Sequence, residues 1–316
     1  MAAEGFGLLR DAYLRARGEN PLLPPLTPEH EARLRRRVER AFDHGGVAAS
    51  RAGRLCGFMV AGPPFAYRGL VAALVPEFGH AVAPGEEASL YGSLYAALGE
   101  RLVRNGAHLH LIGHFVADRS TQRSLYDLGF GAVVSETLRD LSDVPRAAVA
   151  TADTGDVARV EHVGPLARWD AFAPLAAEHA AYYRASPLFL SKDDALETAR
   201  AELEEHRQAG DQLFVSRAHG VPLAYLVVGR CQGVSEGRLL EGSATAQVRS
   251  AYAVPAARRR GIGSALLQGA VAWARRKGFE RLFVEHETAN LHGGPFWRRH
   301  FVPFLVFSMR YVDRSL

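Results

Sequence analysis

One stretch, Ala246–Ala265, restricts the fold of this chain more than any other part of the sequence. Alternating side chains predict a strand that runs to Val254, and Pro255 ends it. A run of arginines follows, then Gly261 and Gly263, and then apolar residues with the period of a helix. The stretch therefore predicts a strand, a basic glycine-rich loop and the first turn of a helix, in that order.

Regular alternation also predicts which side chains of this strand share a face. Ser250 and Tyr252 should point to one side of the sheet, and Gln247 and Arg249 to the other. We therefore expect the sheet to separate these two pairs.

The loop is suited to hold a phosphate group. The N–H groups in the first turn of a helix lack intrahelical partners, and the helix dipole places partial positive charge there. Gly261 and Gly263 let a ligand approach the backbone closely. Arg258, Arg259 and Arg260 add charge and forked donors. Because the sequence lacks Gly-Lys-Ser/Thr, and Gly-Ile-Gly lacks the third glycine of a dinucleotide fingerprint, neither ATP nor NAD is favoured.

The pattern Arg258-x-x-Gly261-x-Gly263 resembles the acetyl-CoA loop of the GNAT acyltransferase superfamily, Gln/Arg-x-x-Gly-x-Gly/Ala. The context is also similar to the family, because a strand precedes the loop and an amphipathic helix and a second strand, at residues 282–287, follow it. Asn290 and Trp297 then stand at the family's usual separations.

The resemblance implies acetyl-CoA as co-substrate and requires no metal. Pantetheine would run along the end of the first strand and use its backbone groups, and the pyrophosphate would lie on the loop. A backbone N–H near Ala253 would polarise the thioester carbonyl and stabilise the oxyanion. The cofactor-binding residues implied in this way are Ala251, Tyr252, Ala253, Val254, Arg258, Arg259, Arg260, Gly261, Ile262, Gly263, Ser264, Ala265, Asn290 and Trp297.

The groups that would transfer protons depart from the family pattern. Gln247 stands where some relatives supply a glutamate base, and an amide does not accept a proton usefully at neutral pH. Glu285, His286 and Glu287 on the second strand are the candidate catalytic substitutes, with a surface carboxylate or a packed imidazole as the structural alternative. Trp297 replaces a tyrosine that many relatives use as general acid, and indole donates a hydrogen bond without giving up its proton.

The second half of the chain repeats the order of predicted elements of the first half, which indicates an internal duplication. Placing Gly106 on Gly278 also places His114 on His286 at the same offset. The fold class expected is therefore α/β with an α+β mixed sheet, arranged as two tandem GNAT-like acyltransferase domains. The expected division is a GNAT-like domain at residues 1–145, a linker at residues 146–157 and a second GNAT domain at residues 158–316.

The two halves differ in charge at the phosphate loop. Glu86 and Glu87 occupy the positions of Arg258 and Arg259, and no Gly-x-Gly precedes the helix of the first half. Carboxylates there would repel a pyrophosphate, so we expect a degenerate first copy and one CoA site per chain.

The 316 residues suffice for two globular domains, and 48% of them are hydrophobic and 23% charged. The net charge of +4 is mild and the arginines are scattered, so no nucleic-acid partner is expected. No apolar run approaches the length of a membrane span or a leader segment, and Cys56 and Cys231 are too few for a disulfide framework. We therefore expect a cytoplasmic protein without membrane contact, a monomer whose halves form an internal pseudo-dimer.

Three classes of function fit these features. The favoured one is direct transfer of an acetyl group from acetyl-CoA to an amine of a small molecule or an exposed amine of a protein. An enzyme similar to mycothiol synthase is a form of this class that only the tandem architecture supports. A non-catalytic acyl-CoA-binding or interaction protein is the alternative, favoured by Gln247 and Trp297. A transferase that uses aminoacyl-tRNA dispenses with the CoA loop, so the intact residues 258–263 argue against it.

Overall fold

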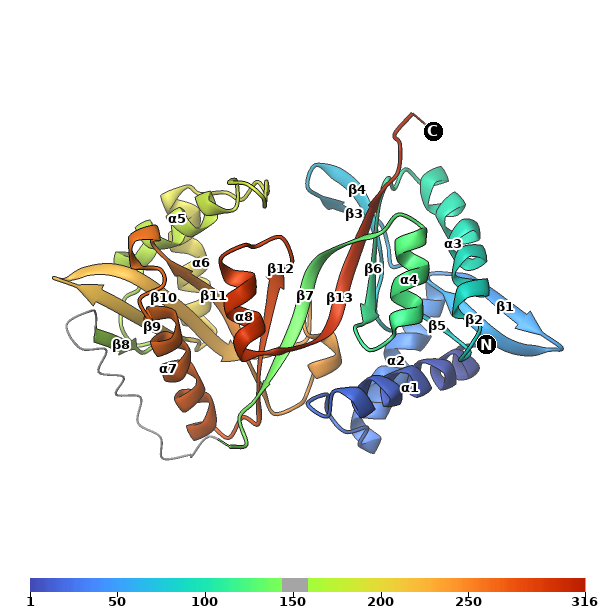
Figure 1. Cartoon of the computed structure of the whole chain (residues 1–316), viewed down its shortest axis with the longest axis horizontal. Coiled ribbons are helices and arrows are strands. Elements are labelled where there is room, and N and C mark those ends of the chain that lie inside the picture. The colour runs from blue at the N-terminus through green and yellow to red at the C-terminus, as the bar shows by residue number, and fades with distance from the viewer. Residues whose placement is uncertain (144–158, 316) are drawn as a thin grey trace. The chain divides into compact units, whose positions relative to one another are not determined.

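The computed structural model of the chain describes residues 1–143 and 159–315, and the expected linker at residues 146–157 lies outside them. The chain forms two compact units, each described by itself (Figure 1). The first unit contains Met1–Thr137, His286–Thr288 and Gly294–Leu316, and the second contains Leu138–Glu285 and Ala289–Gly293. The units therefore do not follow chain order, because the C-terminal residues cluster with the first unit.

The first unit has two sheets and a set of flanking helices. The smaller sheet has the order β1-β2-β5, and the larger one contains the order β3-β4-β6-β13-β7. Its strands are β1 (Val47–Arg51), β2 (Arg54–Met59), β3 (Phe65–Tyr67), β4 (Leu70–Val75), β5 (His80–Val82), β6 (Leu109–Phe115), β7 (Gly131–Asp140) and β13 (Val302–Tyr311). Its helices are α1 (Ala2–Glu19), α2 (Pro28–Asp43), α3 (Glu87–Arg104), α4 (Arg119–Asp127) and α8 (Gly293–His300).

Local sequence signals account for most of these elements. The Thr27 side chain accepts a hydrogen bond from the His30 N–H, and Pro28 occupies the first helical position of α2, where both residue types are favoured. A stripe of leucines on α3 packs into the core of the unit, where Leu94, Leu98 and Leu102 are buried. The C-terminal strand β13 pairs antiparallel with β6 and lies between β6 and β7 (Figure 1).

Two buried neutral histidines make the stability of the first unit depend on pH. His114 is 2% exposed, and burial lowers its pKa to about 4, while burial also lowers the pKa of His80. In the unfolded state the His114 imidazole binds a proton as pH falls below about 6.5, whereas in the folded state it stays neutral until pH nears 4. Protonation of the unfolded state therefore lowers the free energy of unfolding by about 3 kcal/mol as pH falls from 6.5 toward 4. Urea denaturation across this pH range should show the loss, and His114→Gln should flatten the dependence. An unchanged slope in the variant would contradict the assignment.

The second unit is built around one sheet with helices on both faces. Its strands have the order β12-β11-β10-β9-β8. They are β8 (Arg159–Val163), β9 (Gln212–Ala218), β10 (Val221–Arg230), β11 (Thr245–Ala253) and β12 (Arg281–Glu287). The helices are α5 (Ala173–Tyr182), α6 (Leu196–Gln208) and α7 (Ile262–Arg276), and short 3-10 turns cover Asp170–Phe172, Arg238–Leu240 and Pro255–Ala257.

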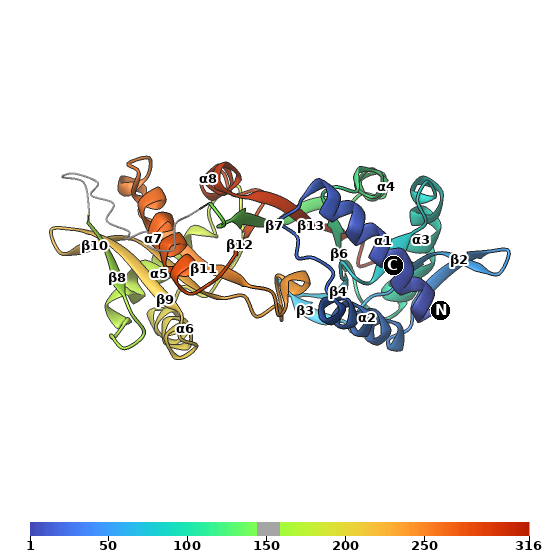
Figure 2. The ribbon, with the colours of Figure 1, turned by 90° about the horizontal axis from the view of Figure 1, so that it is seen from below.

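Different residues of the same strands cover the two faces of this sheet. Tyr225 and Tyr252 share a core with α5 and α6. On the other face, Phe214 of β9 lies under Gly269 of α7, where an added Cβ would come within 2.8 Å of its ring. Figure 2 shows α6 and α7 on opposite sides of these strands. The sheet therefore separates the α5 and α6 face from the α7 face.

A β-bulge in β11 overturns the expected alternation of its side chains. Val227 of β10 pairs with Ser250 and Val228 pairs with Val248, so Arg249 is an extra residue in the strand. Arg249 reaches Asp211, which His206 of α6 contacts, and Ser250 reaches His179 of α5. The prediction that the sheet separates Arg249 from Ser250 is therefore wrong, because the bulge turns both side chains toward α5 and α6.

Candidate functional site

The predicted phosphate loop connects β11 to the first turn of α7. Gly261 is the N-cap residue of α7 and adopts φ 80°, a left-handed conformation that glycine reaches without strain. Arg259 also lies in this region, with φ 60°. Arg259 and Arg260 are exposed, and the first turn of α7 begins directly after them at Ile262. The loop thus presents exposed guanidinium groups beside the free N–H groups of a helix N-terminus.

Strands β11 and β12 separate beside this loop. Their parallel pairing covers Thr245 to Val248 on β11 and ends at Val284 on β12, whereas β11 continues to Ala253. The Val254 N–H donates to the Leu223 carbonyl of β10 at 3.0 Å. By alternation, the backbone groups of Ala251 and Ala253 point away from β10, toward the side where the pairing with β12 has ended. An extended ligand could pair with these groups as an added strand.

Arg258 lies across this edge of β11. Its Nε donates to the Ala253 carbonyl at 3.0 Å. The guanidinium carbon lies 5.0 Å from the ring centroid of Tyr182 and 5.7 Å from that of Tyr252. The first arginine of the loop therefore contacts both the backbone edge and two aromatic rings.

A hydroxyl and imidazole cluster on the α5 face was not predicted from the sequence. His179 Nδ1 lies 3.0 Å from the Tyr225 hydroxyl and 3.3 Å from the Ser250 hydroxyl, and the two hydroxyls are 2.9 Å apart. Burial, together with the charges of Lys192 and Arg258, lowers the pKa of His179 to about 3. The imidazole is therefore neutral at physiological pH and fixes the two hydroxyl groups.

Two further contacts tie α5 to the predicted site. Tyr252 Oη donates to Glu178 at 2.9 Å, and burial followed by this carboxylate raises the pKa of Tyr252 to about 12. Tyr182 Oη donates to Asn290 Oδ1 at 3.0 Å. Asn290 Oδ1 also accepts from the backbone N–H of Gly293 at 2.7 Å. The predicted residues Tyr252 and Asn290 are thus both held by α5.

A second polar network surrounds Gln247, where the family pattern has a base. The Gln247 amide donates to Glu236, which lies in the loop between β10 and β11. Burial, the largest cause, raises the pKa of Glu236. Arg249 Nη1 donates to Gln247 Oε1 at 2.8 Å, and Arg249 Nε lies 3.6 Å from Asp211. The carboxyl group of Glu236, whose pKa is raised, thus lies beside Gln247, the position where the family pattern has a carboxylate.

Gly229 makes room for the carboxylate that holds Arg249. A Cβ added to Gly229 would lie 1.6 Å from Asp211 Oδ1. Gly229→Ala should therefore displace Asp211 and lower the free energy of unfolding by about 2–3 kcal/mol, as overpacking of a core does. Urea denaturation measures this loss, with Gly164→Ala as the control because a Cβ added to Gly164 would have no heavy atom within 4 Å. Equal stability of the two variants would contradict the role given to Gly229.

The structure divides the predicted catalytic residues between the two units. Glu285 is half-buried in the second unit, whereas His286 and Glu287 belong to the first. His286 is 5% exposed, its Nδ1 lies 3.1 Å from the Glu287 carbonyl, and burial lowers its pKa. Trp297 also belongs to the first unit and packs edge-on against Phe301, with ring centroids 5.6 Å apart. The catalytic roles of these residues stay predictions.

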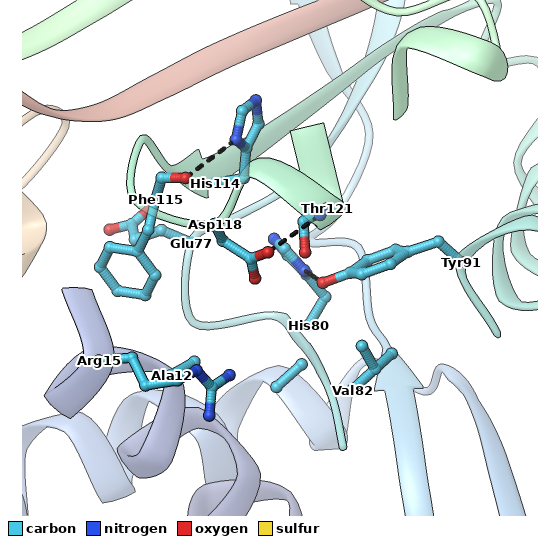
Figure 3. Close-up of a pocket in the computed structure, with 11 residues that line it drawn as sticks. Ala12, Arg15, Glu77, His80, Val82, Tyr91, His114, Phe115, Asp118 and Thr121 are labelled. Atoms are coloured by element: carbon cyan, nitrogen blue, oxygen red, sulfur yellow. Dashed lines mark hydrogen bonds between the residues drawn. The ribbon is translucent and has the colours of Figure 1, made fainter. Parts of the chain in front are cut away.

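In the first unit, His80 fills the corresponding divergence of strands. Parallel pairing of β4 with β6 ends at Val75 and Ile112, and the chain then turns into β5, which pairs with β2. His80 of β5 donates through Nε2 to the Gly113 carbonyl of β6 at 2.7 Å. Its Nδ1 lies 2.8 Å from the Tyr91 hydroxyl (Figure 3). A side chain therefore bridges the two strands where an extended ligand would otherwise pair with them.

Two acidic residues, Glu86 and Glu87, stand at the N-terminus of α3 in the first unit. Glu87 Oε2 accepts a hydrogen bond from the Gly85 N–H at 2.9 Å, directly before α3. Glu86 pairs with Arg51 at 2.8 Å. Two carboxylates thus lie beside the N-terminus of α3 without capping its N–H groups, and their charge would repel a phosphate there.

Within residues 1–143 and 159–315, no group of three His, Cys, Asp or Glu side chains is arranged to hold a metal ion. The helices of the same residues include none that is long and apolar enough to cross a membrane.

Two comparisons with known proteins give matches. Residues 176–301 match the model of the acetyltransferase (GNAT) family. The structure is similar to that of a GCN5-related N-acetyltransferase from Sphaerobacter thermophilus, with TM-score 0.56 and 16% identity over 88% of this chain and 85% of that one. It is also similar to a GNAT-family acetyltransferase from Colwellia psychrerythraea, with TM-score 0.49 and 11% identity over 89% of this chain and 97% of that one. No curated protein matches the chain.

The match at residues 176–301 identifies a GNAT acetyltransferase domain in this chain. The expected fold class, a mixed α+β sheet in tandem GNAT-like domains, is confirmed.

Proposed function

We propose that the chain is an acetyl-CoA-dependent N-acyltransferase with a single CoA site, formed by the second unit. The divergence of β11 from β12 beside the Arg258–Gly263 loop carries the proposal. Pantetheine would pair with the backbone of Ala251 and Ala253, and the pyrophosphate would lie on the loop and the first turn of α7. One of these N–H groups would polarise the thioester carbonyl and stabilise the oxyanion.

Within this proposal, Glu236 takes up the proton that the acceptor amine releases. Its raised pKa makes it a stronger base than an exposed glutamate, and Gln247 holds it beside the position that lacks a carboxylate. The amine nitrogen forms a bond to the acetyl carbon, the carbon–sulfur bond breaks, and CoA leaves as the thiolate. The first unit acts as a structural partner, because His80 bridges the divergence of its strands and the carboxylates of Glu86 and Glu87 would repel a phosphate at α3.

Acetyl transfer across a panel of amines tests the proposal. Release of the CoA thiol should depend on the amine, and mass spectrometry should find the acetylated product. Calorimetry with CoA, run alongside, should give one site per chain. CoA binding without amine-dependent turnover would favour the alternative of a non-catalytic acyl-CoA-binding protein.

A further inference from the structure

A pocket in the first unit lies between α1, β5, β6 and the start of α4 (Figure 3). It has about 300 Å³ of empty space, its open mouth included, which is near the lower limit for small-molecule sites. Of the polar residues that line it, Arg15 of α1 is exposed, Asp118 is half-buried and Thr121 is buried. The pocket therefore suits a ligand of few atoms, with a cation of the protein at its mouth.

Two opposite charges line this pocket without pairing with each other. Asp118 Oδ1 accepts a hydrogen bond from the Thr121 N–H at 2.9 Å and so caps α4. Within the described residues, no donor reaches the second oxygen of Asp118, Oδ2, and no carboxylate pairs with Arg15. Figure 3 shows Arg15 across the pocket from Asp118. A ligand that carries both a positive and a negative charge would give each of them a partner.

A buried hydroxyl group beside Asp118 also lacks a donor. Thr121 is 1% exposed, and its Oγ1 accepts no hydrogen bond from the part of the chain that the structure describes. A buried polar atom left without a partner costs free energy, which a ligand donor would recover. The inner end of the pocket therefore offers acceptors to a ligand that brings donors.

The two histidines of the pocket do not oppose a cationic group. Burial lowers the pKa of His80 and lowers that of His114 to about 4, so both imidazoles are neutral at physiological pH. The Tyr91 hydroxyl lies 2.8 Å from His80 Nδ1, and His80 Nε2 donates to the Gly113 carbonyl at 2.7 Å. The ring of His80 is thus fixed by two hydrogen bonds and adds no positive charge.

We propose that the first unit binds a small α-amino acid in this pocket, with its ammonium group on Asp118 and Thr121 and its carboxylate on Arg15. The ammonium group has three donors, and Asp118 Oδ2 and Thr121 Oγ1 accept two of them. The carboxylate accepts from the guanidinium at the mouth. A simple amine leaves Arg15 without a partner, and a simple carboxylate leaves Asp118 without one. The site shares no residue with the proposed CoA site, so the inference does not rest on the proposed function.

Glycine and its two halves test the class of ligand. Ligand-observed NMR on the full chain, without CoA, measures the dissociation constants of glycine, methylamine and acetate. Glycine should bind in the millimolar range or more tightly. Methylamine and acetate should each bind roughly tenfold more weakly or worse, because each loses one charge-assisted contact. Binding of either half as tightly as glycine, or no binding of glycine, would overturn the proposal.

Variants of the two charged residues place glycine in the pocket. Asp118→Asn keeps a residue that caps α4 well but removes the charge, and Arg15→Gln removes the charge of an exposed side chain. Each variant should weaken glycine binding at least about tenfold. Asp127→Asn is the matched control, because Asp127 lies at the other end of α4, where it pairs with Arg123, and it should leave the affinity unchanged. Unchanged affinity in both Asp118→Asn and Arg15→Gln would place glycine elsewhere in the chain and contradict the assignment.

Two variants of Thr121 separate its hydroxyl group from its shape. Thr121→Val removes the hydroxyl and should weaken glycine binding several-fold, whereas Thr121→Ser keeps it and should retain most of the affinity. Equal affinity in the two variants would show that the hydroxyl takes no part. Calorimetry with CoA should give the wild-type result in all of these variants. If CoA binds at one site while glycine does not bind, this inference fails and the proposed function stands; glycine binding in the pocket without any CoA binding would give the reverse.

Discussion

Replacing both Arg258 and Arg259 by glutamate should abolish CoA binding. These side chains precede the left-handed turn at Gly261 and the free N–H groups of α7. Each arginine would lose a charge-assisted contact with the pyrophosphate, and each glutamate would repel it. Together these changes cost about 4 kcal/mol or more, so the dissociation constant should rise at least ~1,000-fold. Titration calorimetry with CoA measures this loss.

A matched control changes the same net charge at another surface. Arg36 and Arg40 are exposed on α2, and Arg36→Glu with Arg40→Glu alters the total charge as the first pair does. CoA affinity should be unchanged in this control at moderate ionic strength, because neither arginine belongs to the loop or to the first turn of α7 and exposed charges are screened by salt. Unaffected binding in the loop variant, or two equivalent CoA sites in the wild type, would reject the assignment of a single site to the second unit.

The loop could be predicted from the sequence because all of its parts are contiguous. The Arg-x-x-Gly-x-Gly spacing fixes a strand end, a left-handed glycine and a helix start within one short segment. The hairpin of β1 and β2 and the Thr27 cap of α2 also depend only on residues that are close together in the sequence. Short-range signals of this kind require no knowledge of tertiary packing.

The α5 face of the site could not be predicted because distant segments form it. His179 and Ser250 lie 71 positions apart, and Tyr182 and Asn290 lie 108 apart. The bulge at Arg249 also reverses the side-chain alternation expected of a regular strand. A regular strand would place the neighbouring residues Arg249 and Ser250 on opposite faces, so the sequence pattern could not predict that they share one. Glu236 lies in an irregular loop, where no periodic pattern predicts the position of a side chain.

The strand with which β13 pairs could not be predicted from the sequence either. A strand after α8 is expected to stay with the domain that precedes it, yet residues 294–316 cluster with the first unit and β13 pairs with β6. Strand pairing is set by long-range packing of apolar faces, such as those of Leu305 and Phe307. Many strand pairings satisfy the same alternation, so the pattern alone does not select the partner.

Glu236→Gln should lower kcat roughly 100-fold or more while the KM for acetyl-CoA changes little, as expected for loss of a general base. Burial raises the pKa of Glu236 above the ordinary 4.5. The carboxylate accepts a proton only when ionised, so the wild-type rate should fall as pH falls through this raised pKa. The variant has no carboxylate to protonate, and its acidic limb should disappear.

Glu280→Gln is the matched control, because Glu280 lies on the surface, where its side chain is 63% exposed and pairs with Arg281. This variant makes the same chemical change and should keep both the rate and the acidic limb of the wild type. Loss of rate in Glu236→Gln with the acidic limb intact would show that Glu236 only positions Gln247, through the hydrogen bond between them. In that case the base must be another group, and Glu285, His286 and Glu287 are the residues to replace next.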